Sequence, residues 1–385
     1  MTERIEADWL TGAPARAVTQ MLEEAGHQAW FVGGCVRNAL LGSPVSDLDL
    51  TTDARPERVM ELARAAGLKP VPTGIDHGTI TVVARGTPIE VTTFRRDVET
   101  DGRRATVAFS HDIAEDAARR DFTMNALYAD ARGHVADPLG TGLGDLAAHR
   151  LRFIGEAEER IREDYLRILR FFRFHAWYGD PEGGIDADGL AACAGLAEGI
   201  EGLSRERIGA EMIKLMSARD PAPAVASMAM SGVLMRVLPG GASDPLSVLV
   251  HVEEEAGLVP DPIRRLALVG GEDVGECLRL SRAQEASLQA LRNAMEAGWG
   301  PGELGYRLGA VRALDVLALN AALSGREIDP VSRETVEAGA HASMPVKAAD
   351  LMPDLTGPAL GEALREIETR WIASDFTLER GDLLP

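Results

Sequence analysis

The chain has 385 residues, 45% of them hydrophobic and 26% charged, so it is long enough for two or three domains and too apolar to be disordered. Its three cysteines, Cys35, Cys193 and Cys277, lie far apart without metal-ligand spacing, which argues against a disulfide framework or a zinc site and predicts a cytoplasmic protein. No apolar run is long enough to cross a bilayer, and the net charge of −20 argues against a generally basic, RNA-binding surface.

The acidity is unevenly distributed along the chain. Residues 1–180 carry 22 Lys and Arg against 28 Asp and Glu, while residues 181–385 carry 18 against 32. Most of the excess acid therefore lies in the C-terminal half, and the first half stays compatible with a phosphate-rich ligand. Small molecules or proteins remain the alternative ligands of an acidic chain.

The first 146 residues alternate helix and strand signals. Helical periodicity at 14–26 and 56–67 ends at a glycine in both cases, and β-branched runs predict strands at 28–34 and 47–52. Two further runs predict a hairpin, with strands at 79–84 and 88–94 joined through 85–87.

From about Ala147 onward the β-branched runs disappear and helical periodicity takes over. We therefore expect an α/β head followed by an all-α neck, body and tail in an elongated multidomain protein. The expected boundaries are a head at 1–146, a neck at 147–216, and a body and tail at 217–385.

Asp47 and Asp49 form a D-x-D pair in the predicted strand at 47–52. Residues two apart on a strand project to the same face, so both carboxylates point together and favour a cation between them. Oxygen ligands of this kind suit Mg²⁺ bound to nucleotide phosphates. Glu90 is the third carboxylate if its strand lies alongside, although a D-x-D pair is also typical of a solvated strand end.

Gly33 and Gly34 come before Arg37, at a predicted turn from strand to helix. Such a turn brings backbone N–H groups close to a triphosphate, and Arg37 would add a charged contact. A tight turn with a surface arginine is the alternative.

Together the two features, FVGGCVRNALLGSPVSDLDLTT (31–52), resemble motif A of the polymerase-β-like nucleotidyltransferases. The similarity is to class II tRNA nucleotidyltransferases (CCA-adding enzymes) and bacterial poly(A) polymerases, and it covers roughly residues 28–216. It implies a nucleotidyltransferase head, a base-selecting neck, and a body and tail that bind tRNA. Asn38 departs from the family, which usually has Asp there, and an amide cannot carry charge.

Arg119-Arg120-Asp121-Phe122-Thr123-Met124-Asn125-Ala126 matches the family motif R-R-D-F-T-x-N-A. The resemblance assigns Arg120 to nucleotide contact, with Asp121 and Asn125 fixing the turn; structural salt bridges are the alternative for the arginines. Asp101-Gly102-Arg103-Arg104 supplies the D-G-R signature of a family loop needed for adding the final A.

In the neck, EDYLRILRFFRF (163–174) places Asp164, Arg167, Arg170 and Arg173 three residues apart, as one polar stripe on a predicted helix. A carboxylate beside a guanidinium matches the base edges of cytosine and adenine and repels those of uracil and guanine. The resemblance gives this selection to Asp164 and Arg167, with Arg170 and Arg173 in support; a salt-bridged, purely structural neck is the alternative.

The resemblance thus implies addition of C, C and A to the tRNA 3′ end from CTP and ATP, with release of pyrophosphate. Asp47, Asp49 and Glu90 would be catalytic, Asp47 and Asp49 would hold Mg²⁺, and Gly34, Arg37 and Arg120 would bind the nucleotide. A poly(A) polymerase, a CC-adding enzyme and a catalytically silent RNA-binding assembly factor stay open. The oligomeric state is not predicted.

Overall fold

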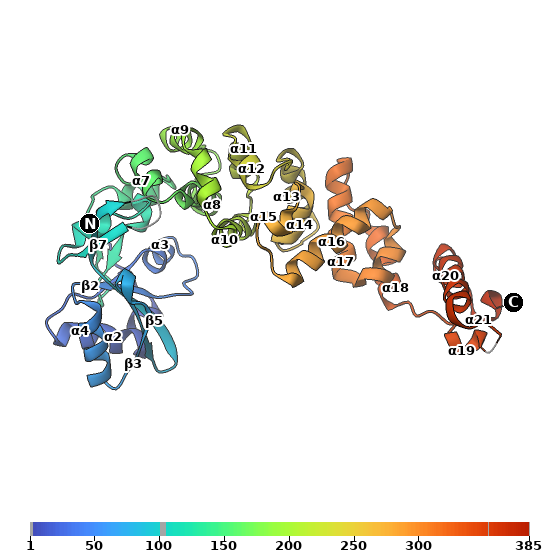
Figure 1. Cartoon of the computed structure of the whole chain (residues 1–385), viewed down its shortest axis with the longest axis horizontal. Coiled ribbons are helices and arrows are strands. Elements are labelled where there is room, and N and C mark those ends of the chain that lie inside the picture. The colour runs from blue at the N-terminus through green and yellow to red at the C-terminus, as the bar shows by residue number, and fades with distance from the viewer. Residues whose placement is uncertain (1–2, 101–104, 353, 385) are drawn as a thin grey trace. The chain divides into compact units, whose positions relative to one another are not determined.

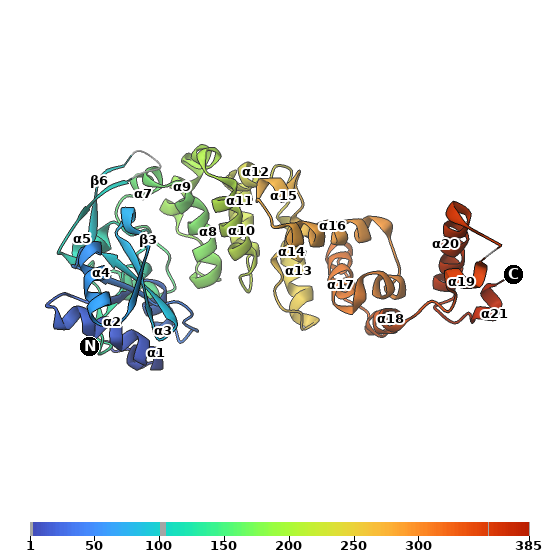
Figure 2. The same ribbon diagram turned by 60° about the horizontal axis from the view of Figure 1, so that its bottom comes forward.

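The computed structural model describes residues 3–100, 105–352 and 354–384 (Figures 1 and 2). The chain divides into two compact units. The first unit comprises the residues up to Arg207 together with Met230–Arg236, and the second comprises Ile208–Ala229 and the residues from Val237 onward. The expected α/β head and helical remainder are both present.

A seven-stranded mixed sheet forms the centre of the first unit, in the order β3-β4-β5-β2-β1-β8-β9. Its strands are β1 (Trp30–Val32), β2 (Asp49–Thr52), β3 (Lys69–Gly74), β4 (Thr79–Ala84), β5 (Thr87–Thr93), β8 (Tyr128–Ala129) and β9 (Val135–Ala136). Only β2 and β5 pair in parallel; the other neighbours are antiparallel. A separate hairpin consists of β6 (Arg95–Thr100) and β7 (Ala105–Phe109).

The predicted hairpin at 79–94 is confirmed. Ala84 pairs with Thr87, so the connection is the two residues Arg85 and Gly86, with φ of 51° and 85°. Two left-handed residues in succession match the right-handed twist of the flanking strands, which is why a glycine suits the second position.

Helices surround this sheet and continue into the neck (Figure 1). They are α1 (Asp8–Thr11), α2 (Ala13–Glu24), α3 (Gly34–Leu40), α4 (Pro56–Ala65), α5 (Ile113–Ala118), α6 (Gly142–Ala147), α7 (Ala157–Glu163), α8 (Leu166–Tyr178) and α9 (Ala187–Gly195), with 3₁₀ turns η1 (Ile75–His77), η2 (Thr123–Asn125) and η3 (Ala197–Gly202). Helices α2 and α4 contact each other and both pack on β4 and β5. Their fully buried Val18, Leu22 and Val59 supply the apolar face that covers the sheet.

Four phenylalanines join the neck helix α8 to the loop segments of the head. Phe122 stands 4.9 Å from Phe153 and 5.2 Å from Phe174, and Phe153 stacks on Phe171 at 5.4 Å. All four are buried. Offset and tilted aromatic contacts of this kind add to the apolar burial, so α8 is held firmly against the segment around Phe122.

After β9 the described residues form helices and no further strand, as predicted. Those that follow α9 are α10 (Arg205–Met216), α11 (Ala222–Met230), α12 (Val233–Val237), α13 (Asp244–Glu255), α14 (Pro262–Val269), α15 (Val274–Cys277), α16 (Arg282–Ala297), α17 (Pro301–Ser324), α18 (Pro330–His341), α19 (Ala348–Leu351), α20 (Gly357–Ala373) and α21 (Arg380–Leu383). In the described part of the chain, no helix combines the length and apolar character that spanning a membrane requires.

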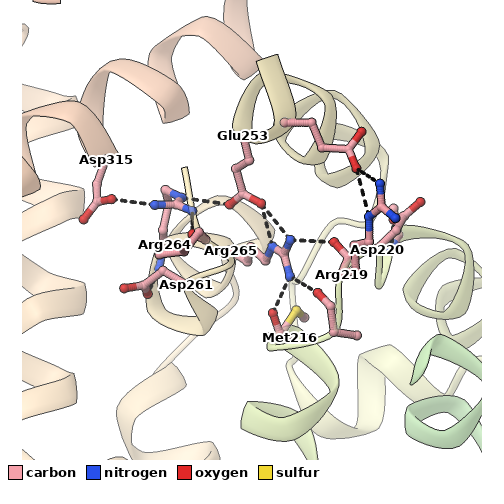
Figure 3. A network of polar contacts seen from close by, with 12 residues as sticks. Met216, Arg219, Asp220, Glu253, Asp261, Arg264, Arg265 and Asp315 are labelled. Carbon is pink, nitrogen blue, oxygen red and sulfur yellow. Dashed lines mark hydrogen bonds and ion pairs between the residues drawn. The ribbon is translucent and has the colours of Figure 1, made fainter. Parts of the chain in front are cut away.

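A buried network of charges lies in the second unit (Figure 3). Glu253 on α13 accepts hydrogen bonds from both Arg264 and Arg265 on α14, at 2.8 and 2.7 Å. Arg264 also donates to Asp315 on α17, and Arg265 donates to backbone carbonyls that include that of Met216. These four charged residues are at most 4% exposed, so the network fixes three helices against the end of α10.

Candidate active site

The turn between β1 and α3 has the strand-to-helix geometry expected for Gly33 and Gly34. Gly33 adopts φ 70° and ψ −121°, and Gly34 begins the helix. A Cβ at Gly33 would be strained by its positive φ and would stand 3.7 Å from a terminal nitrogen of Arg120. The absence of a side chain therefore keeps the backbone beside Arg120 uncovered.

Asp49 and Glu90 are direct neighbours, because β2 and β5 pair in parallel with these two residues in register. This confirms the expectation that the strand of Glu90 lies alongside. The expected strand at 47–52 is wrong at its start, since β2 begins only at Asp49. Asp47 is exposed in the segment before β2, and bonding to β5 starts only at Leu48, whose carbonyl accepts the Glu90 N–H.

The three carboxylates nevertheless act on one another. Burial raises the pKa of Asp49 to about 6, and the negative charges of Glu90 and Asp47 add to the increase while Arg120 opposes it. The charged form of Asp49 is thus costly without a cation nearby. In the described ranges, no three His, Cys, Asp or Glu side chains converge closely enough to hold a metal ion by themselves.

Arg120 lies near Asp49, and hydrogen bonds to residues of the head fix its guanidinium. Its Nε donates to the Tyr128 hydroxyl and one Nη to Asp116, both at 3.0 Å. Burial opposes ionisation of Asp116, but Arg120 and Arg119 outweigh it and hold the pKa of Asp116 at about 2. The salt-bridge interpretation of the arginine pair is therefore correct for these contacts, and they fix the guanidinium of Arg120 next to Gly33.

Arg37 is 6% exposed, so the alternative of a surface arginine is wrong. It donates to Oδ1 of Asn125 at 2.5 Å, to the Tyr178 hydroxyl at 2.8 Å, and twice to Oδ1 of Asn38. Its guanidinium also stacks 3.9 Å from the centre of the Tyr178 ring. Burial lowers the pKa of Arg37, although Tyr178 and the charge of Asp121 oppose this effect.

A continuous series of hydrogen bonds leads from the neck helix to α3. Arg170 donates from Nε to Asp121 at 2.7 Å, and Asp121 accepts from the Asn125 amide at 3.0 Å. Asn125 in turn accepts from Arg37. Asp121 also accepts from the N–H of Phe122, which confirms that Asp121 and Asn125 fix this turn.

The expected stripe on one neck helix is wrong for Asp164. Helix α8 begins at Leu166, and Asp164 is extended, with φ −156° and ψ 105°. Its Oδ1 accepts the Leu166 N–H at 3.1 Å, so the carboxylate caps α8 instead of lying along it. Its other oxygen accepts from Arg207 at 2.6 Å.

The three arginines of α8 have different surroundings. Arg167 donates to Glu163 at 2.6 Å and to the carbonyls of Arg160 and Arg119. Arg170 holds Asp121, whereas Arg173 stands over the Phe174 ring and is close enough to lower the pKa of Arg37 further. The neck stripe therefore points toward the Arg119–Arg120 segment and toward Arg37.

Sequence reasoning missed the residues that hold the predicted ones in place. Asp116 had a usable signal, because it stands one helical turn before Arg120. Tyr178 had none, being 141 residues from its partner Arg37. Asp101-Gly102-Arg103-Arg104 lies outside the described residues.

The sequence matches two families. Residues 29–152 match the "Poly A polymerase head domain" and residues 184–244 match the "Probable RNA and SrmB-binding site of polymerase A". CCA tRNA nucleotidyltransferase 1, mitochondrial, of Mus musculus is 40% identical over 52% of this chain and 46% of its own length. The CCA-adding enzyme of Leuconostoc citreum is 40% identical over 59% and 54%. The chain spans about half the length of these curated relatives.

Solved structures match over more of the chain. The Bacillus stearothermophilus CCA-adding enzyme in complex with CTP is 30% identical, with a TM-score of 0.74 over 94% of this chain and 93% of that one. The Thermotoga maritima CCA-adding enzyme complexed with tRNA_CCA has a TM-score of 0.69 over 99% and 95%, at 19% identity. The second likeness shows the shared fold alone.

Proposed function

This chain belongs to the CCA-adding enzyme and poly(A) polymerase family, and we propose that it adds C, C and A to the 3′ end of tRNA from CTP and ATP. The reaction is attack of the terminal 3′-hydroxyl oxygen on the α-phosphorus of the nucleotide, with pyrophosphate leaving. The observation that carries the proposal is the pairing of Asp49 with Glu90 beside the Gly33-Gly34 turn and Arg120.

The carboxylates suit a divalent cation, which we take to be Mg²⁺. The raised pKa of Asp49 and the negative charges around it favour binding of a cation, which would stabilise the ionised carboxylates. Asp47 and Asp49 would hold the ion with phosphate oxygens of the nucleotide, and Glu90 would assist. When bound, the ion supplies activation of the hydroxyl and charge neutralisation of the pyrophosphate.

The residues of the chain itself orient the nucleotide. Gly34 would offer backbone N–H to the triphosphate, and Arg37 and Arg120 would bind phosphate and sugar oxygens. Asp116 and Tyr128 hold Arg120 in place, so it would meet the nucleotide without reorganising.

The base would be chosen in the neck by Asp164 and Arg167. A carboxylate has about four lone-pair positions, so Asp164 can accept an amino group of cytosine or adenine while it caps α8 and pairs with Arg207. Arg167 would donate to the ring nitrogen, with Arg170 and Arg173 in support. Uracil and guanine present the opposite pattern and would be rejected.

We propose the boundaries 1–146, 147–216 and 217–385 for head, neck, and tRNA-binding body and tail. We also propose that the chain works in the cytoplasm, since its three cysteines are all free thiols.

The experiment uses three tRNA substrates: one lacking CCA, one ending in C-C, and one complete. CTP and ATP are supplied singly and together with Mg²⁺, and the products are resolved to single nucleotides. Ordered addition of C, C and A that then stops is the expected result. Stopping after C-C would indicate a CC-adding enzyme, an open ladder of A a poly(A) polymerase, and no incorporation an RNA-binding assembly factor.

A further inference from the structure

Asn38 stands at the end of the hydrogen-bond series that begins at Arg170, and its two amide atoms face opposite ways. Its Oδ1 accepts from Arg37 at 3.2 Å (Nε) and 2.9 Å (Nη). Its Nδ2 donates to the carbonyl of Pro44 at 3.0 Å. A guanidinium only donates and a carbonyl only accepts, so an amide is the side chain of this size that satisfies both.

The Pro44 carbonyl belongs to the segment 42–48, which leads from α3 to Asp47. Before Leu48 this segment does not pair with a strand of the sheet. The Ser43 N–H donates to the backbone carbonyl of Asn38 at 2.8 Å. Asn38 thus contacts the segment twice, once through its backbone and once through its side chain. Asp47 itself is exposed and accepts only from the neighbouring Ser46 hydroxyl among the described contacts.

We propose that Asn38 is a positioning residue that ties the segment carrying Asp47 to the buried guanidinium of Arg37. The amide lets one residue orient a phosphate-binding arginine and a metal-binding carboxylate together. A carboxylate at this position would keep the Arg37 contact and would face the Pro44 carbonyl without a proton to donate. The part of this inference that concerns the metal rests on the proposed function. The link from Asn38 to the segment 42–48 does not.

Two variants separate the roles of the amide. N38D keeps the acceptor for Arg37 and removes the donor to Pro44, whereas N38A removes both. N293D is the matched control, because Asn293 is exposed on α16 and its Oδ1 accepts only from Gln289 among the described contacts, at 2.7 Å. N293D therefore adds the same charge at a site in the second unit.

The direct readout is hydrogen exchange of the Ser43 amide in the free protein, whose N–H donates to the Asn38 carbonyl, compared with exchange of α3. Loss of the exposed hydrogen bond from Asn38 to Pro44 should speed exchange of the Ser43 amide by about threefold to tenfold in both N38D and N38A. Exchange of N293D should equal that of the wild type. The second readout is the Mg²⁺ concentration for half-maximal incorporation, which should rise by a similar factor in N38D at an unchanged melting temperature.

A segment that exchanges in N38D as in the wild type, and faster only in N38A, would overturn the proposal and leave Asn38 as an anchor of Arg37 alone. Faster exchange in N38D but not in N38A would overturn it as well, since charge and not the lost donor would be the cause. If the wild type incorporates no nucleotide, the proposed function fails. The exchange measurement still decides whether Asn38 holds the segment that carries Asp47.

Discussion

Replacing Glu253 by glutamine tests whether the buried charge network holds the second unit together. Glu253 is 2% exposed, and both of its oxygens are used, one by Arg264 and the other by Arg265. A glutamine in its place would keep the shape but set an amide N–H₂ against a guanidinium, and one buried negative charge, that of Asp315, would remain for two buried cations.

Breaking a buried pair in this way costs about 3–5 kcal/mol, because the remaining charge has no compensation away from water. For a unit of this size, 1 kcal/mol shifts the melting temperature by about 2–4 °C, so E253Q should lower it by roughly 6–20 °C. Thermal unfolding followed by circular dichroism at 222 nm, with tryptophan fluorescence in parallel, measures the shift.

The neighbouring Glu254 provides the control. Its side chain is 54% exposed and pairs at 3.2 Å with Arg219, which is 88% exposed. Exposed pairs contribute about 0–1 kcal/mol, so E254Q should change the melting temperature by a few degrees at most. Equal shifts for the two variants would refute the reasoning that burial, and not the mere presence of an ion pair, sets the cost.

Three further outcomes are expected in the first unit. D47A should abolish incorporation with every nucleotide, and because Asp47 is exposed its melting temperature should stay unchanged; retained activity at saturating Mg²⁺ would contradict the metal assignment. D164A should impair the choice of CTP and ATP over UTP and GTP, and an unchanged ratio of kcat/KM values would reject base selection by this carboxylate. Burial opposes ionisation of Asp121, but Arg170 and Asn125 outweigh it and hold its pKa at about 2, below the ordinary 3.8. Its stabilising effect is thus present above the unfolded pKa and lost as the pH falls toward 2, so D121N should flatten the fall in melting temperature between about pH 5 and pH 2; an equally steep fall would count against it.

Local patterns predicted the parts of the fold that runs of β-branched and apolar residues mark clearly. Strand β4 was predicted at its observed bounds, and its residues Ile80, Val82 and Ala84 are fully buried. Strand β3 was missed because Lys69–Gly74 contains two prolines, which are tolerated there since β3 is an edge strand of the sheet. Strands β8 and β9 have two residues each, too few for any periodicity.

The candidate site also contains features that local patterns predicted and features that they did not. The adjacency of Asp49 and Glu90 followed from two strands that local residues specify. The capping role of Asp164 did not, because spacing by three predicts a helix equally well when the first residue of the series lies just outside it. Contacts between distant segments, such as that of Arg37 with Tyr178, depend on how the neck packs against the head. A local sequence pattern cannot predict this packing.

The net charge of −20 is a poor guide to the potential at the site, because most of the arginines there are already matched by an acid. Arg120 is paired with Asp116, Arg167 with Glu163, and Arg170 with Asp121. Arg37 differs from these three: its hydrogen bonds within the described chain go to Asn38, Asn125 and Tyr178, which carry no charge. A buried guanidinium without an anionic partner attracts an anion more strongly than a paired one, since its charge is neither cancelled nor well solvated. An aspartate at position 38 would place an anion against Arg37, whereas Asn38 leaves its charge available to the triphosphate of the proposed function.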